Sequence, residues 1–150
     1  MPSGPLSYPS LGDLPILLVN VINSATGGAQ MFQMLVDTGS ARTCLPADRA
    51  AFFGHNNLDH QVKTTTIRGV GGPAKAHIHT LRIELIDPLG RTWRKLIPPW
   101  RSAMMPVLFA ETIDLKTGIL GRDILSQWKS VTFRPTPRVP HSSWLIEIAL

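Results

Sequence analysis

The sequence predicts an all-β domain with one short helix near its C-terminal end. Its 150 residues, 43% of them hydrophobic, are enough for one compact core, which at this length buries about two-thirds of the surface of the unfolded chain. The apolar residues come in short runs separated by 13 prolines and 12 glycines, and this punctuation favours many short strands over long helices. We find no internal repeat, so the chain is not a fused duplicate of a smaller unit.

Strands are predicted where apolar or alternating runs are bounded by Pro, Gly, Asn and Asp. Residues 1–12 are rich in Pro, Ser and Gly, and we expect a flexible leader there, followed by a single domain over residues 13–150. The predicted elements of the first half are strands over 14–22 and 29–36 joined by a turn, a turn-rich stretch over 53–59, a polar strand over 61–68, and a glycine-dense tip over 69–73.

The second half continues the pattern and adds the helix. Asp87-Pro88-Leu89-Gly90 is a strong turn signal. Ile124, Leu125 and Trp128 recur at helical spacing without Pro or Gly among them, which predicts a short helix that starts near Arg122. The predicted strands lie over 74–86, 92–97, 105–109, 118–121, 131–133 and 144–149.

Cysteine usage and hydropathy bear on the compartment. The single cysteine, Cys44, cannot form an internal disulfide, and beside Leu45 it is best interpreted as a small apolar residue. No apolar run reaches the length of a membrane span, and the first residues lack the basic start and apolar centre of a signal peptide. We therefore expect a soluble, cytoplasmic protein without a membrane segment.

The net charge of +5 and the pI near 10 motivate a nucleic-acid hypothesis, because phosphate binding needs clustered Lys and Arg. Between Arg91 and Arg101 four basic residues are interleaved with Trp93 and Trp100, which could form a platform for single strands. The simpler interpretation is a solvated hairpin whose tryptophans pack inward. We expect no nucleic-acid partner and keep this binding as an alternative.

The first motif with chemical content is Leu35-Val36-Asp37-Thr38-Gly39-Ser40, an apolar strand that delivers a carboxylate onto a tight turn. An Asp that follows buried apolar residues is unfavourable unless it is hydrogen-bonded. Ordinary turn chemistry explains the motif equally well, because Asp before Thr-Gly can accept a backbone N–H. The motif alone does not decide between a turn and a catalytic carboxylate.

The second motif is Gly118-Ile119-Leu120-Gly121-Arg122-Asp123, an apolar strand, a glycine and the start of the short helix. The two motifs, in this order and with Gly69-Val70-Gly71-Gly72 between them, resemble the retropepsin branch of the aspartic proteases. In that family an apolar pair precedes Asp-Thr-Gly-Ser/Ala, a glycine-rich hairpin flap follows, and an apolar pair with Gly-Arg-Asp/Asn opens the helix. The resemblance covers residues 14–131 and implies a retropepsin-like closed barrel with one lobe per chain.

The resemblance implies that Asp37 is the catalytic aspartate of an aspartic endopeptidase. Such enzymes hydrolyse peptide bonds with two carboxylates about 3 Å apart that share one proton, and they need no metal or cofactor. Pepsin-like members carry two such motifs in one chain, whereas this chain has one. The implied enzyme is therefore a homodimer in which Asp37 of a second copy completes the site and an extended peptide is the substrate.

The residues that follow Asp37 also receive roles from the resemblance. Thr38 braces the two active-site loops against each other, and Gly39 keeps the turn free of a side chain. Ser40 is expected to donate its hydroxyl to the outer oxygen of Asp37 at the substrate-binding edge. The flap-tip residues would contact the peptide through their backbone, although a plain hairpin turn also explains their glycines; these residues are Gly69, Val70, Gly71 and Gly72.

The second motif is implied to support the site structurally. Ile119 and Leu120 are expected to pack beneath the active-site loop, with Gly121, Arg122 and Asp123 beside it. One departure from many retroviral members is Ala41, which stands where an acidic residue pairs with the arginine, so Arg122 must find another partner in the backbone or in Asp123. The loop is closer to the pepsin type and to free-standing cellular or bacterial members.

Three further expectations concern metal binding, the terminal strands and the function. His77 and His79 share one face of a strand, but no nearby Cys or paired carboxylate completes a ligand set, so we expect no metal. The apolar strands 14–22 and 144–149 are expected in the dimer interface or its flanking sheet. The alternative function is a catalytically silent retropepsin-like module that dimerises or holds peptides.

Overall fold

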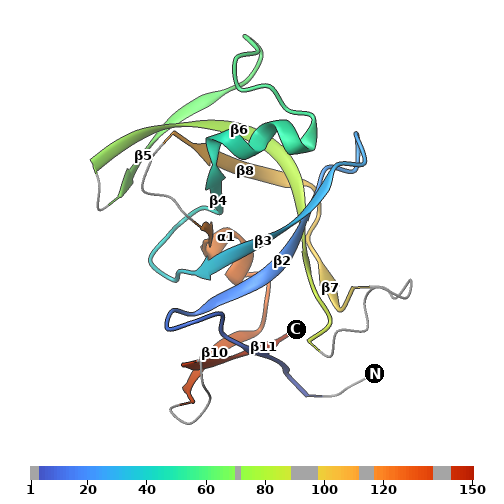
Figure 1. The fold of residues 1–150 in the computed structure, drawn as a ribbon, viewed down its shortest axis with the longest axis vertical. Helices are drawn as coiled ribbons and strands as arrows, with labels where there is room; N and C mark the ends of the chain where they lie inside the picture. The colour runs from blue at the N-terminus through green and yellow to red at the C-terminus, as the bar shows by residue number, and fades with distance from the viewer. Residues whose placement is uncertain (1–3, 70–71, 89–97, 112–116, 137–142) are drawn as a thin grey trace.

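A computed structural model describes residues 4–69, 72–88, 98–111, 117–136 and 143–150 (Figure 1). Strands dominate these residues, as the sequence predicts. The elements are β1 (Leu6–Pro9), β2 (Ile16–Ile22), β3 (Ala29–Val36), β4 (Cys44–Pro46), the 3₁₀ helix η1 (Ala47–Phe53), β5 (Thr64–Gly69), β6 (Gly72–Leu85), β7 (Trp100–Arg101), β8 (Met105–Ala110), β9 (Gly118–Leu120), α1 (Arg122–Leu125), β10 (Ser130–Pro135) and β11 (Trp144–Ala149).

Six strands close into a barrel. Their order is β2-β3-β9-β4-β8-β6, and an antiparallel pairing of β2 with β6 completes the ring. β3 runs parallel to β9, and β4 runs parallel to β8, which brings segments distant in sequence side by side. β5 pairs with the far half of β6 and forms a hairpin that extends beyond the barrel, as Figure 1 shows. The predicted all-β, retropepsin-like barrel is thus confirmed.

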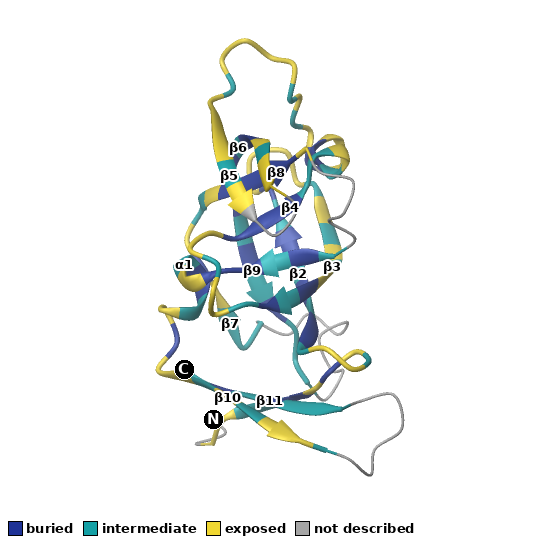
Figure 2. Cartoon of the chain, turned by 90° about the vertical axis from the view of Figure 1, so that its left-hand side faces the viewer, coloured by how far each residue is buried: buried dark blue, intermediate teal, exposed yellow. Residues whose placement is uncertain are grey.

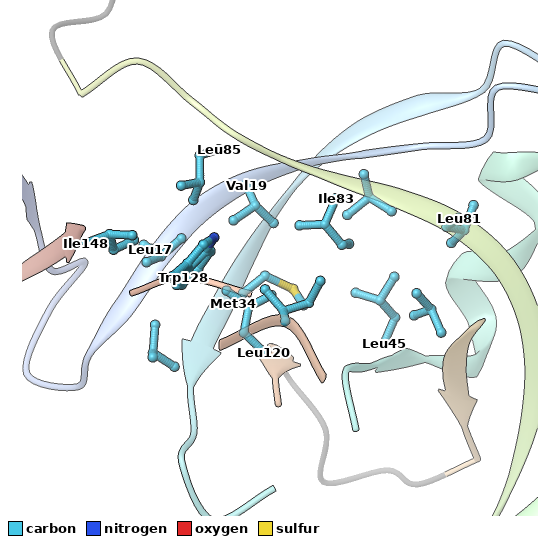
Figure 3. Close-up of a cluster of buried hydrophobic side chains, with 14 of the residues drawn as sticks. Leu17, Val19, Met34, Leu45, Leu81, Ile83, Leu85, Leu120, Trp128 and Ile148 are labelled. Atoms are coloured by element: carbon cyan, nitrogen blue, oxygen red, sulfur yellow. The ribbon is translucent and has the colours of Figure 1, made fainter. Parts of the chain in front are cut away.

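The core follows the two-residue period of the strands. Along β2, Leu17, Val19 and Val21 are buried, and they pack against buried residues of β6 at matching positions. Figure 3 shows this cluster, where Met34, Leu120 and Trp128 join it from β3, β9 and the segment after α1. The ring of Trp128 also meets the half-buried ring of Trp100 edge to face, with 5.4 Å between the ring centroids.

A second sheet of three strands, in the order β1-β11-β10, lies below the barrel (Figure 2). It corrects the prediction of a flexible leader over residues 1–12, because Leu6–Pro9 pairs with β11. Tyr8 explains why this segment forms a strand. Its side chain is buried, and its hydroxyl donates to the Ile86 carbonyl at 2.6 Å. A single large aromatic anchors a segment whose composition otherwise predicts disorder.

The two helices compare differently with the sequence-based assignment. The helix at Arg122 is confirmed, whereas the 3₁₀ helix over Ala47–Phe53 is not among the predicted elements. Pro46 precedes this helix, and Gly54 follows it with a left-handed φ of 72°. The predicted strand over 92–97 lies outside the described residues. No helix among the described residues is long and apolar enough to cross a membrane.

Candidate active site

Asp37 follows directly on the last residue of β3. Val36 is buried and pairs with Leu120 of β9, and the Asp37 N–H donates to the Leu120 carbonyl at 3.1 Å. The chain then turns out of the barrel, so Asp37 is half-buried whereas Thr38 and Gly39 are exposed. The barrel therefore fixes the backbone of a carboxylate that sits at its surface.

The turn itself holds the carboxylate. Oδ1 of Asp37 accepts the Gly39 N–H at 2.9 Å, and the Asp37 carbonyl accepts the Ser40 N–H at 3.2 Å. A Cβ on Gly39 would lie 3.1 Å from Oδ1, which is tighter than an ordinary contact. The turn chemistry expected from the sequence is thus present, and it fixes one oxygen of the carboxylate.

Ser40 does not make the predicted hydrogen bond to Asp37. Its hydroxyl donates to the Arg42 carbonyl at 2.8 Å. A serine hydroxyl readily bonds to the backbone of a nearby residue, and here this local bond uses the one proton that the hydroxyl can donate.

Arg122 connects the helix α1 to this turn through hydrogen bonds. Its backbone N–H donates to the Ser40 carbonyl at 2.8 Å, and its guanidinium Nη1 donates to the carbonyls of Thr38 and Gly39 at 3.1 and 3.2 Å. Of the two partners considered for Arg122, the structure selects the backbone. With alanine at position 41, the arginine binds the backbone of the Asp37 turn directly.

Asp123 binds the other end of the same loop. Its two oxygens accept the backbone N–H of Thr43 at 2.9 Å and the Thr43 hydroxyl at 2.7 Å, and Arg42 Nε lies 3.7 Å away. Thr43 is fully buried, and its hydroxyl oxygen also accepts the Gly121 N–H at 3.2 Å. Sequence reasoning missed Thr43, a polar residue between Arg42 and the apolar pair Cys44-Leu45, whose position is its only signal.

Glycine is required at position 121 because the Arg42 backbone comes very close to it. A Cβ there would lie 2.5 Å from the carbonyl carbon and oxygen of Arg42, so only glycine lets the two segments touch. Ile119 and Leu120, just before it, point in opposite directions. Leu120 lies in the main core, whereas Ile119 packs against a smaller cluster on the outer side of the barrel wall. The two side chains therefore pack in different clusters on either side of β9.

The β5–β6 hairpin contributes to that smaller cluster. Its apolar face, with Ile67, Ala76 and Ile78, packs against Cys44, Leu108, Ala110 and Ile119. Cys44 is buried, as expected, and burial raises the pKa of its thiol to about 11. At the tip, Gly69 pairs with Gly72, whose φ of 94° favours glycine, while Val70 and Gly71 lie outside the described residues.

The histidines of β6 have separate partners. His77 Nε2 lies 2.6 Å from Glu111 Oε1, a bond that lowers the pKa of Glu111. His79 Nε2 lies 2.6 Å from Asn57 Oδ1, and its ring stacks on His55 with 4.3 Å between centroids. Burial, followed by the nearby His55 and His77, lowers the pKa of His79 to about 4. Within the described ranges, no three potential ligands gather to hold a metal.

The basic segment considered for nucleic-acid binding is described only in part. Residues 91–97, which include Trp93, lie outside the described residues. Trp100 packs inward against Trp128, in line with the simpler interpretation of that tryptophan.

The fold and the site together define an acid-protease-like domain, a closed barrel that presents an Asp-Thr-Gly turn braced by a short helix. A family model described as aspartyl protease matches residues 22–124, and the chain belongs to this family.

Among solved structures, the chain is similar to the EIAV protease complexed with the inhibitor HBY-793. The TM-score is 0.51 and the identity 22%, over 77% of this chain and 88% of that one. This similarity shows the shared fold. No curated protein matches the chain.

Proposed function

We propose that the chain is one subunit of an aspartic endopeptidase in which Asp37 of two copies activates a water molecule. The observation that carries the proposal is the placement of Asp37 on a rigid turn at the barrel surface, braced by Arg122. Membership of the aspartyl protease family supports the chemistry. The sequence contains one such motif, so the second carboxylate comes from another copy.

The reaction follows from two carboxylates held about 3 Å apart, where like charges cannot both ionise and one proton is shared. The ionised member accepts a proton from the water, which attacks the scissile carbonyl. The protonated member hydrogen-bonds the carbonyl oxygen and then helps to protonate the leaving nitrogen. The products are a carboxylic acid and an amine, and the dyad returns to its singly protonated state.

The residues around Asp37 position its carboxylate and take no part in the proton transfers. Thr38 and Gly39 hold the turn, and Arg122 fixes their carbonyls so that the Asp37 carboxylate keeps its direction. The β5–β6 hairpin is the proposed flap, which lays its backbone along an extended peptide. Ser40 lies at the edge of the substrate path in this proposal.

The test is cleavage of a peptide library between pH 4 and 6 by the wild-type protein and by Asp37→Asn. Cleavage by the wild type alone is the expected result, and cleavage that survives the substitution refutes the assignment. Because the site needs two copies, activity should fall with the square of protein concentration below the dimer constant. Activity that stays linear over a wide dilution range contradicts the shared site.

The alternative is a catalytically silent module of the same fold that binds peptides or dimerises. Asp37, Thr38 and Gly39 are all present, which favours the enzyme. Binding of library peptides without cleavage by either protein would support the module.

A further inference from the structure

Residues 54–62 form most of the connection between η1 and β5, and they extend beyond one end of the barrel (Figures 1 and 2). Most of these residues are exposed, and Leu58 is exposed to 90%. None of the nine side chains belongs to either hydrophobic cluster. The 54–62 segment is therefore held to the barrel by polar contacts and ring contacts, and the hydrophobic core does not fix it.

Two stacked histidine rings make the main contact between the segment and the barrel. The ring of His55 lies on the ring of His79 of β6, with 4.3 Å between the centroids and 16° between the planes. His79 is buried and also meets Phe109 of β8 edge to face, whereas His55 is half-buried. One ring of the stack thus belongs to the barrel wall, and the other belongs to the segment.

The Asn57 amide determines which nitrogen of His79 carries the proton. Nδ2 of Asn57 donates to the Ala47 carbonyl at 2.8 Å, so Oδ1 is the atom that lies 2.6 Å from His79 Nε2. An amide oxygen can only accept, and His79 Nε2 must donate. A second proton on this ring would go to Nδ1 and would leave a buried cation in the stack.

The Asn23 amide fixes the opposite arrangement at His55. Oδ1 of Asn23 accepts the Ala25 N–H, and Nδ2 donates to the Phe53 carbonyl at 2.8 Å. The same Nδ2 lies 3.3 Å from His55 Nε2, so an N–H group faces this ring nitrogen, which must accept. A proton on His55 Nε2 would place two donors against each other. Both rings of the stack are therefore neutral in the closed arrangement.

The titratable groups around the stack do not offset a positive charge on it. These groups are His77 on β6 with Glu111 beyond it, Asp48 on η1, which lines the same hollow as His55, and Asp59 and His60 in the segment. The three carboxylates face other partners, which are His77, Arg49 and His60. Among the described residues, neither ring of the stack forms an ion pair with a carboxylate.

We propose that the stacked pair His55 and His79 is a proton-operated latch, which holds the 54–62 segment against β6 at neutral pH and releases it in acid. When the segment opens, both rings enter water and can each bind a proton without losing an amide partner. The open state therefore binds more protons than the closed state, and a fall in pH shifts the equilibrium toward it.

The size of the effect follows from the buried ring. Burial, with the nearby His55 and His77, lowers the pKa of His79 from 6.5 to about 4 in the closed state. For this ring alone, the open population should rise about twentyfold between pH 7 and pH 5. A proton taken up by His55 adds to this rise.

Release of the segment loosens the start of the β5–β6 hairpin. β5 begins at Thr64, directly beyond the segment, and among the described strands it pairs with β6 alone. Once the latch opens, β5 is placed only by this pairing and by the packing of Ile67. The hairpin, which is the flap of the proposed endopeptidase, should thus move more freely in acid. The latch itself goes beyond the proposed function and does not depend on it.

Hydrogen exchange followed by NMR measures the opening. The reporters are the N–H groups of Asp59 and Val62, which donate to the carbonyls of Asn56 and Asp59. Rates are corrected for the intrinsic pH dependence of exchange, and the Asp37→Asn background excludes self-cleavage. We expect the open population at the reporters to rise by about tenfold or more from pH 7 to pH 5, while the amides of β2 show no such rise.

Matched variants identify the rings that are responsible. The double variant His55→Gln and His79→Gln keeps an acceptor for Asn23 and a donor for Asn57 but takes up no proton, and its open population should change by less than about twofold. His60→Gln removes a histidine of the same segment whose side chain is 91% exposed, and it should behave like the wild type. Ring signals of the wild type decide if the double variant does not fold, because a His79 ring that titrates above pH 6 overturns the latch.

The outcomes separate a local latch from other causes. An equal rise at the amides of β2 means global unfolding in acid and overturns the proposal. A rise that persists in the double variant, or that is lost in His60→Gln, also overturns it. A chain that shows the release but cleaves no peptide keeps the latch and rejects the endopeptidase, whereas cleavage without the release rejects the latch alone.

Discussion

The buried hydroxyl of Thr43 gives the sharpest test of how the loop after Asp37 is held. Thr43→Val keeps the shape of the side chain but removes a hydroxyl that donates to Asp123 Oδ1 and accepts the Gly121 N–H. Asp123 Oδ1 keeps the Ile124 N–H at 2.9 Å, so the main loss is an acceptor for the buried Gly121 N–H. A buried donor without a partner costs about 1–3 kcal/mol, and we expect a loss of about 2–3 kcal/mol in unfolding free energy.

Thr43→Ser is the matched variant. It keeps the hydroxyl and loses one methyl group, which costs about 1 kcal/mol. Packing alone predicts the opposite order, because Val conserves volume and Ser does not. Urea unfolding followed by tryptophan fluorescence, at one protein concentration and with equal m-values, measures both changes. If Thr43→Val is as stable as Thr43→Ser or more so, the hydroxyl does not hold the loop.

Three other predictions test separate parts of the structure. The pKa of His79 is about 4 in the folded chain against 6.5 for the free group, so the unfolded state binds the proton first. Stability should therefore decline as the pH falls below 6.5, by about 2 kcal/mol between pH 7 and 5. The decline should be smaller in His79→Gln, and equal declines in urea unfolding would contradict it. Gly121→Ala should destabilise by about 2–3 kcal/mol through contact with the Arg42 backbone, more than Gly39→Ala in the same assay; a milder effect than Gly39→Ala argues against the close approach. The thiol of Cys44, with its pKa raised to about 11 by burial, should react with a thiol reagent at pH 8 only as fast as the chain unfolds, and rapid labelling of the folded chain would place it at the surface.

Local pattern in the sequence determined the fold class and the positions of the elements around the site. β3 and β11 have the predicted bounds, because alternating apolar residues followed by a turn specify a strand without reference to the rest of the chain. The turn at Asp37 and the helix at Arg122 were predictable for the same reason. Their conformations depend on residues within a few positions along the chain.

The tertiary structure alone decides which residues far apart in the sequence form hydrogen bonds with each other. Thr43 and Asp123 lie 80 positions apart, and only the closed barrel brings them to 2.7 Å. The strand conformation of residues 6–9 depends on Tyr8 reaching the Ile86 carbonyl, 78 positions along the chain. Sequence periodicity records which face of an element is buried, whereas a hydrogen bond requires the position of both atoms, and the packed barrel alone supplies that.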